Sequence, residues 1–298
     1  METKKREALA KAALFCTSIL WGCSFFIVKN TVDVFPPNLL LAIRFTIGCL
    51  LLCLIFRKRL KRLDKRSLLA GVAIGAVLFF AYMVQTIGIQ YTTPGKNAFL
   101  TAIYCVIVPF LFWAMSKKRP DAYNIAAAFI CLLGIGLVSL TDELSIGGGD
   151  ALSLLGGLLF ALQIAMVARF AQDKDPVLLT IIQFATAAIL SWTFSLTTET
   201  FSISWITADA LWGILFLSVV STALCLSLQN VGQKYTSAST AAIILSLEAV
   251  FGVLFSMLFY GERLTWRLVL GFALIFAAVL TSVTKLSFLR RKKLPPAV

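Results

Sequence analysis

Apolar stretches of about twenty residues follow one another along the whole of this 298-residue sequence. About 20 apolar residues make a helix that crosses the ~30 Å hydrocarbon core of a bilayer. Such a helix also satisfies its own backbone hydrogen bonds in lipid. The pattern therefore predicts an all-α membrane protein with ten transmembrane helices, at residues 8–28, 38–56, 67–90, 94–115, 121–140, 150–170, 176–196, 208–232, 237–259 and 264–284.

The composition agrees with a single membrane domain over residues 1–298. Hydrophobic residues make up 59% of the chain and charged residues only 14%, against roughly 25% charged residues in a soluble domain. The seven cysteines lie in apolar stretches without a CxxC pair, and histidine is absent. We therefore expect no disulfide framework, no metal site and no cofactor.

The positions of lysine and arginine predict the orientation in the membrane. With the N-terminus inside, 22 of the 27 basic residues fall on the cytoplasmic side, mostly at 4–11, 57–66, 117–119 and 285–293. Because short cytoplasmic loops carry an excess of lysine and arginine, both termini are expected in the cytoplasm, as basic tails 1–7 and 285–298. The net charge of +13 thus indicates topology and contacts with anionic lipids of the bilayer, and not a nucleic-acid partner.

Two halves of the sequence resemble each other. Ser24 and Gln163, like Pro37 and Pro176, are 139 residues apart, and further on the segment QTIGIQYT (85–92) matches QNVGQKYT (229–236) at a distance of 144. These matches define repeat one at 8–140 and repeat two at 150–284. Since five helices are an odd number, the second repeat enters the membrane from the opposite side. Inverted repeats of this kind build many transporters, with the substrate site near the midplane between them.

Four segments carry a resemblance to a known family: LWGCSFFIVK (20–29), PPNLLLAIRF (36–45), YTTPGKNAFLTAIYCVIVPFLFW (91–113) and SLEAVFGVLFSMLFYGERLTWRLVLGFAL (246–274). With them the chain resembles the EamA-type permeases of the drug/metabolite transporter superfamily. The resemblance implies a ten-helix bundle in a bacterial plasma (inner) membrane, with a central cavity and alternating access. It also implies export of amino acids, other metabolites or toxic compounds. Ala249 departs from the proline common in the family, so less kinking is expected there.

Polar residues inside the spans are the candidate substrate-binding residues, because polar groups in a membrane helix usually face a cavity or a partner. The repeat pairs a polar residue with a polar residue at four places: Ser24 with Gln163, Arg44 with Gln183, Gln85 with Gln229, and Tyr104 with Glu248. Ser24, Arg44 and Gln85 should line an outer vestibule, and Gln163, Gln183 and Gln229 should line an inner one. Tyr104 and Glu248 should lie midway between the two vestibules. Trp21 and Tyr82, one turn before Ser24 and Gln85, either stack on a substrate or serve packing alone.

The charged candidates each have competing interpretations. Glu248 could bind a substrate amine, carry a coupling proton, cap a neighbouring helix or pair with Arg44. Arg44 could hold a substrate carboxylate through paired hydrogen bonds or extend to the outer head groups. Lys29 and Lys96, at helix ends, are expected to extend to the head groups in the same way.

Two further motifs concern helix packing and bending. Gly71 and Gly75 form a GxxxG motif, which favours close helix packing. Packing within the monomer is preferred to a dimer face, although a monomer and a dimer both remain open. Pro109 should bend its helix, either as a gate hinge or as a static kink. The glycines at 147–149 predict a flexible connection between the repeats, with Asp150 as a helix cap.

These patterns favour a secondary transporter of small metabolites such as amino acids, with export as the preferred direction. Proton coupling through Glu248 and facilitated diffusion both fit. The alternatives are a facilitative channel and a non-transporting membrane scaffold. An enzyme is not expected, because the sequence offers no histidine and no nucleophile–base pair, and hence no catalytic residue.

Overall fold

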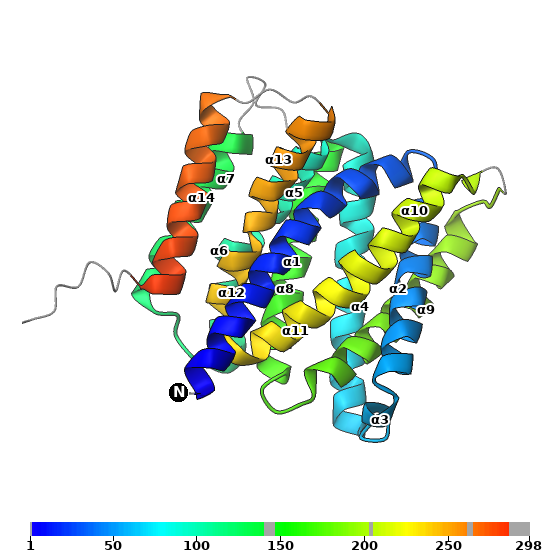
Figure 1. Ribbon diagram of the computed structural model, residues 1–298, viewed down its shortest axis with the longest axis horizontal. Coiled ribbons are helices and arrows are strands. Elements are labelled where there is room, and N and C mark those ends of the chain that lie inside the picture. Colours follow the sequence, from blue (N-terminus) through cyan, green and yellow to red (C-terminus); the bar gives the residue numbers. More distant parts are fainter. Residues whose placement is uncertain (1, 140–146, 203–204, 261–264, 286–298) are drawn as a thin grey trace, which may run out of the picture.

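The computed structural model describes residues 2–139, 147–202, 205–260 and 265–285, and within these ranges every regular element is a helix. The helices lie side by side in one bundle (Figure 1). Their bounds are α1 Glu2–Val32, α2 Pro37–Ile55, α3 Arg57–Leu60, α4 Lys65–Gly88, η1 Ile89–Tyr91, α5 Pro94–Thr101, α6 Tyr104–Ser116, α7 Ala122–Ser139, α8 Gly148–Phe170, α9 Pro176–Thr198, α10 Ala208–Phe216, the π-helix η3 Leu217–Leu224, α11 Cys225–Tyr235, α12 Ala238–Leu245, α13 Leu247–Tyr260 and α14 Trp266–Thr284.

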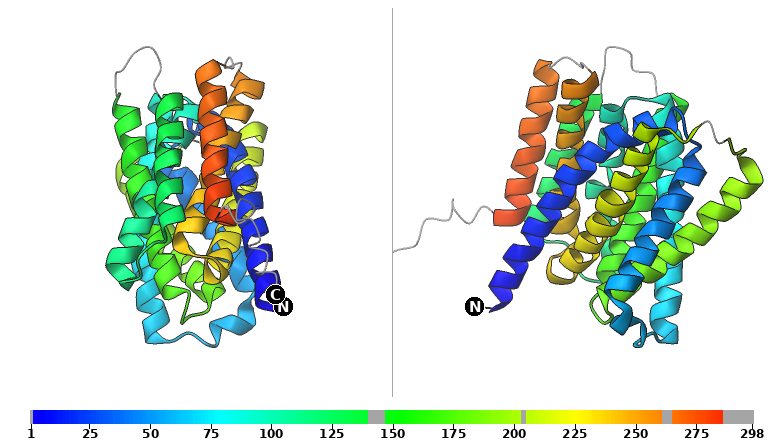
Figure 2. Two further views of the ribbon diagram at one scale, coloured as in Figure 1. Left: turned by 90° about the vertical axis from the view of Figure 1, so that its left-hand side faces the viewer. Right: turned by 45° about the vertical axis from the view of Figure 1, so that its right-hand side comes forward.

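The prediction of an all-helical membrane protein is confirmed. Among the described residues, eight helical segments of 19 to 29 residues are long and apolar enough to cross a membrane. Two shorter apolar stretches, Ala122–Gly134 and Val269–Ser282, lie within α7 and α14. Each predicted span overlaps one of these helices or a broken pair of them. We call the end of the bundle where α1 begins and α14 ends the N-terminal face, and the other end the opposite face (Figure 2).

The first helix begins earlier than the sequence predicted. Residues 2–7 of the expected basic tail form the first turns of α1. Lysine, glutamate, arginine and alanine are good helix formers, and Lys11 Nζ lies 2.7 Å from Glu7 Oε1 one turn away, a spacing that favours a helix. Of the predicted tail 285–298, Lys285 is described and residues 286–298 lie outside the described ranges.

Two long segments are broken at positions that the sequence did not predict. The span at 94–115 is interrupted at Ala102 and Ile103, and α6 continues through Pro109. The span at 237–259 is interrupted at Ser246, even though Ala249 replaces a proline. There the Ser246 hydroxyl donates to the Ile243 carbonyl at 2.8 Å, a side-chain bond that competes with the helical backbone. The interruption lies three residues before Ala249, and the expectation of less kinking at Ala249 stays a prediction.

The GxxxG glycines bring α4 against α9 inside the bundle. A Cβ atom at Gly71 would lie 2.5 Å from Ile182 Cβ, and one at Gly75 would lie 2.8 Å from the Gln183 carbonyl oxygen. Both distances are shorter than real carbon contacts. The motif therefore serves packing within the monomer, as the sequence favoured.

Two pairs of helices flank the bundle, α2 with α9 and α7 with α14 (Figures 1 and 2). At the opposite face the Glu199 carboxylate, at the end of α9, accepts from the backbone amides of Asn38 (2.7 Å) and Leu39 (2.8 Å) in the first turn of α2. At the N-terminal face Arg59 pairs with Asp175 at 2.8 Å. These bonds tie α2 and α9 together at both ends.

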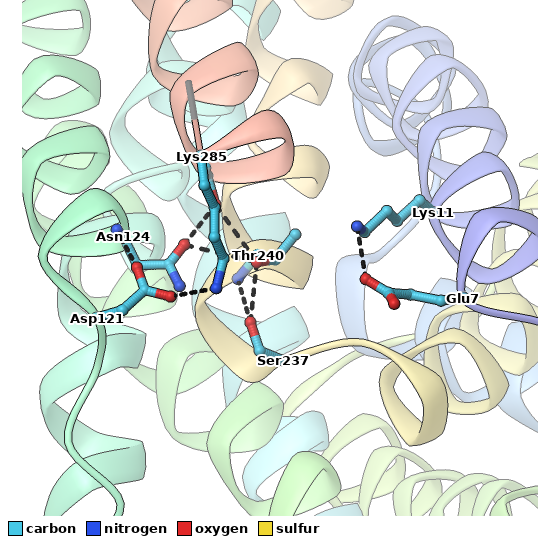
Figure 3. Close-up of polar contacts among 8 residues, drawn as sticks. Glu7, Lys11, Asp121, Asn124, Ser237, Thr240 and Lys285 are labelled. Carbon is cyan, nitrogen blue, oxygen red and sulfur yellow. Dashed lines mark hydrogen bonds and ion pairs between the residues drawn. The ribbon is translucent and has the colours of Figure 1, made fainter. Parts of the chain in front are cut away.

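The second flanking pair is tied at the N-terminal face by a polar cluster (Figure 3). Ser282 of α14 donates to Asn124 Oδ1 of α7 at 2.5 Å, and Lys285 pairs with Asp121 at 2.7 Å. The Thr240 hydroxyl of α12 donates to the same Asn124 oxygen at 3.5 Å. The cluster thus holds α7, α12 and α14 in register.

We predict that Gly75→Ala destabilises the protein by about 1–3 kcal/mol, the usual cost of overpacking, because the new methyl group meets the α9 backbone. The matched control is Gly136→Ala on α7, where an added Cβ meets nothing within 4 Å and alanine favours the helix. Thermal unfolding in detergent measures both. Equal midpoints for the two variants would contradict the tight α4–α9 contact.

Candidate functional site

A small cavity lined by both polar and apolar side chains lies at the centre of the bundle, with about 40 Å³ of free space. That is room for a few water molecules, so a metabolite needs the surrounding helices to move apart. Eight of the ten predicted substrate-binding residues line it: Trp21, Ser24, Arg44, Tyr82, Gln85, Tyr104, Gln229 and Glu248. The structure therefore brings residues from both halves of the sequence into one site.

Arg44 is buried in this cavity and does not reach the head groups. Its side chain is 1% exposed, with Nε donating to the Thr222 hydroxyl at 3.2 Å and Nη2 donating to the Ser221 hydroxyl at 3.4 Å. The guanidinium carbon lies 5.1 Å from the centre of the Tyr82 ring. The guanidinium is therefore oriented by two hydroxyls and an aromatic face, neither of which neutralises its charge.

Glu248 is 4% exposed and contributes a carboxylate to the same cavity. Its Oε1 accepts a hydrogen bond from the Tyr104 hydroxyl at 2.8 Å. Tyr104 belongs to α6 and Glu248 to α13, immediately after the two helix breaks described above. Broken helices thus carry both members of this predicted pair into contact.

Arg44 and Glu248 do not neutralise each other, since no nitrogen–oxygen distance between these two residues falls within 4 Å. Buried charges without a partner are costly, and other groups here are also unsatisfied. Arg44 Nη1, Asn97 Oδ1 and Gln229 Oε1 are buried and have no hydrogen-bond partner in the protein. The cavity therefore offers one donor nitrogen and two acceptor oxygens without partners in the protein to a ligand.

The other two predicted residues form a layer behind the cavity wall. Gln229 Nε2 donates to Gln163 Oε1 at 3.2 Å, and Gln163 Nε2 donates to Gln183 Oε1 at 3.3 Å. On the far side Gln233 Nε2 donates to the Ile164 carbonyl at 3.3 Å. This chain of amides joins α8, α9 and α11 and holds Gln229 in place.

Sequence reasoning missed two polar residues of the cavity, Asn97 and Ser221. Asn97 was recognisable as an amide within a predicted span; its Nδ2 donates to the Ser153 hydroxyl at 2.7 Å. Ser221 and its neighbour Thr222 lie in the π-helix η3. Such segments are frequent at functional sites, but the sequence carries no signal for one here. The Ser221 carbonyl also accepts from the Trp21 indole at 2.9 Å.

The two lysines expected to extend to the head groups are bonded within the protein. Lys96 Nζ lies 2.6 Å from Asp150 Oδ2, and Lys29 Nζ donates to the Gln90 carbonyl at 3.0 Å. That expectation is wrong because both ammonium groups have acceptors within the protein, on neighbouring elements. Asp150 also accepts from the Gly147 amide at 3.1 Å, so it caps α8 from within the first turn.

A second hollow lies at the N-terminal face, with about 550 Å³ of free space. It is bounded by the start of α1, the ends of α6 and α8, and the α11–α12 connection. Its basic lining residues include Lys118 and Lys234. Ile164, which lines the central cavity, and Ala168, which lines this hollow, are one turn apart on α8. Only about one helical turn therefore separates the two spaces.

Comparison with known proteins is consistent with this architecture. The sequence profile of the EamA-like transporter family matches residues 9–140 and 147–284. An uncharacterized transporter of Archaeoglobus fulgidus is 33% identical over 92% of this chain and 86% of its own length. A Chlamydia muridarum S-adenosylmethionine/S-adenosylhomocysteine transporter is 24% identical over 50% of this chain and 46% of its own. A solved crystal structure covers 95% of this chain and 99% of its own, with a TM-score of 0.77 and 15% identity, and so shares the fold.

We predict that Arg44→Met leaves the thermal stability of the ligand-free protein unchanged or raises it. A charge buried without a charged partner is costly, and an apolar side chain of similar length removes that cost. The control is the adjacent Phe45→Ala, which removes a fully buried ring and should cost about 3–5 kcal/mol. Equal losses in the two variants would show that Arg44 serves the fold and not a ligand.

Proposed function

The chain belongs to the EamA-like transporter family, and from that premise we propose that it is a secondary transporter of small zwitterionic metabolites such as amino acids. The single observation that carries the proposal is that a buried guanidinium and a buried carboxyl group lie in the central cavity without pairing with each other. Arg44 offers a guanidinium with an unused Nη1, and Glu248 offers a carboxylate. A ligand with one carboxylate and one ammonium group would neutralise both charges at once.

The neutral groups of the cavity support the same ligand class. An ammonium group has several N–H donors, and the unpaired oxygens of Asn97 and Gln229 would accept from it beside Glu248. A ligand carboxylate would accept from Arg44, which binds such groups through two parallel hydrogen bonds. The tryptophan and tyrosine of the wall, Trp21 and Tyr82, provide apolar faces for the rest of the molecule.

The name of one relative supports the same ligand class. The Chlamydia protein is named for S-adenosylmethionine and S-adenosylhomocysteine, and both compounds carry an amino and a carboxylate group on one carbon. That similarity covers half of this chain. It therefore supports the ligand class and leaves the rest of the substrate open.

We further propose that the bundle spans a bacterial inner membrane ten times, as two inverted five-helix repeats with the N-terminal face in the cytoplasm. The two separate matches to the family profile, at 9–140 and 147–284, support the repeat. The basic residues of α3 and its surroundings, 57–66, and of 117–119 at the same face support the orientation. Alternating access would then carry the substrate between the faces, with export as the proposed direction.

Glu248 also makes proton coupling part of the proposal. A carboxylate that alternates between a substrate ammonium and a proton would link the two movements, because both compete for one site. A facilitative channel is the alternative function. A central cavity of about 40 Å³ does not provide a continuous pore in this conformation, which favours a carrier.

Counterflow in proteoliposomes tests the proposed function. Vesicles preloaded with an unlabelled amino acid or S-adenosyl compound should accumulate the same compound in labelled form, since a carrier exchanges substrate across a closed cycle. We expect Glu248→Gln and Arg44→Gln each to reduce exchange at least tenfold, because a buried charge of the ligand then loses its partner, a loss of about 2–5 kcal/mol.

The matched control is Asp209→Asn, which removes an exposed acidic residue on α10 and should leave exchange unchanged. A pH gradient that drives uptake in the parent chain but not in Glu248→Gln would establish proton coupling. If folded protein exchanges none of these zwitterions, or if both cavity variants exchange normally, the proposed site is wrong.

A further inference from the structure

The cavity is closed toward the opposite face by polar contacts between helices that are far apart in the sequence. Lys96 at the start of α5 pairs with Asp150 at the start of α8, and Lys29 near the end of α1 donates to the Gln90 carbonyl of η1. The Thr92 hydroxyl donates to Asp150 Oδ1 at 3.0 Å. These bonds join α1, α8 and the η1–α5 connection above the cavity.

Three of the closing residues adjoin a residue of the cavity wall. Val28, Ile89 and Asn97 line the central cavity, and they directly precede or follow Lys29, Gln90 and Lys96 in the chain. The closing bonds therefore lie one residue beyond the cavity on three separate elements. Separating them would open the cavity to the opposite face.

The equivalent residues of the other repeat line a hollow. At the repeat distances of 139 and 144, Lys29, Gln90 and Thr92 correspond to the following residues of repeat two: Ala168, Lys234 and Thr236. All three line the hollow of about 550 Å³ at the N-terminal face. At the opposite face these positions are joined by bonds between helices, whereas at the N-terminal face their counterparts line a hollow that lies about one helical turn from the central cavity.

The two residues that correspond to Asp150 and Lys96 in the other repeat do not pair with each other. Asp150 corresponds to Lys11 and Lys96 to Thr240. Lys11 pairs with Glu7 on its own helix at 2.7 Å, whereas Thr240 accepts from Ser237 at 2.8 Å. Figure 3 shows the Glu7–Lys11 pair on α1, separate from the cluster on α7, α12 and α14. Lys11 of α1 and Thr240 of α12 thus bond other residues and not each other, whereas Lys96 and Asp150 pair across α5 and α8.

We propose that the Lys96–Asp150 ion pair, supported by the Lys29–Gln90 bond, is the outer gate of the transport path, and that this structure is the inward-facing form. The inference rests on the function proposed above, since a gate belongs to a carrier that alternates. The Asp150 side chain is 7% exposed and that of Lys96 is 27% exposed. The pair is thus shielded enough to hold the face closed, yet water reaches Lys96 and allows the pair to part.

Cysteine labelling tests the gate without knowledge of the substrate. Ile89→Cys places a thiol at a buried position of the cavity wall, behind the Lys29–Gln90 bond. A membrane-impermeant maleimide added outside intact cells should label it slowly. In Asp150→Asn, and independently in Lys96→Met, we expect labelling to rise roughly fivefold, the effect of losing a partly shielded ion pair. The double variant should add little to either single change.

A second reporter separates gating from loss of structure. Lys234→Cys, in the hollow at the N-terminal face, should be labelled readily in inside-out vesicles. It should react more slowly when Asp150→Asn shifts the protein toward the outward-facing form. Damage to the fold would raise labelling at both reporters. The control variant is Asp175→Asn, which breaks the Arg59 pair away from the path and should change neither reporter.

Three results would overturn the proposal: unchanged labelling of Ile89→Cys in both gate variants, rapid labelling of it in the parent chain, or faster labelling of both reporters together. The chain with only its native cysteines is labelled in parallel to set the background. If counterflow succeeds while labelling stays unchanged, the transporter remains and the gate assignment is wrong. If labelling responds as expected while counterflow fails, the ligand class is wrong and the gate remains.

Discussion

The cost of an unsatisfied polar group in hydrocarbon is the constraint on which this structure depends. Most buried polar side chains have a partner on another helix: Tyr104 on Glu248, Asn124 on Ser282, Asn230 on Thr180. The hydrophobic effect does not draw these helices together, because lipid tails are as apolar as leucine. Bonds between polar side chains therefore help to set the positions of the helices. The few groups left without a partner in the protein therefore stand out, and those of Arg44, Asn97 and Gln229 gather in one cavity.

The bundle combines rigid flanks with an interrupted centre. The flanking pairs α2–α9 and α7–α14 are continuous helices tied by carboxylate and amide bonds. Between them, α5–α6 breaks at Ala102, α12–α13 breaks at Ser246, and η3 winds as a π-helix. A break exposes backbone groups and relaxes the helical register, so the segments that carry Tyr104, Glu248 and Ser221 have the freedom that a moving site needs.

Much of the fold and part of the candidate site could be predicted from the sequence. Hydropathy predicted where each long helix lies, because the bilayer sets a fixed length of apolar chain. Polarity inside the spans identified six of the cavity residues, because a buried polar group in a membrane is rare enough to be informative, and spacing from two of these identified Trp21 and Tyr82. The interruption at Ser246 escaped because serine also occurs within continuous membrane helices, and the π-helix at Ser221 escaped because the sequence carries no signal for it. The bonding of Lys29 and Lys96 escaped because a sequence does not reveal which acceptor lies nearest.

The carboxylate of Glu199 has a consequence for the assembly of the protein during synthesis. It satisfies the first amides of α2, yet it is translated about 160 residues after them. Arg44 likewise lacks its hydrogen-bond acceptors until Ser221 and Thr222 have been translated. When the first half of the chain leaves the ribosome, the start of α2 and a guanidinium within it still lack these partners. The first half therefore enters the membrane before these hydrogen bonds can form. Its helices reach their final places only after the second half has entered the membrane beside them.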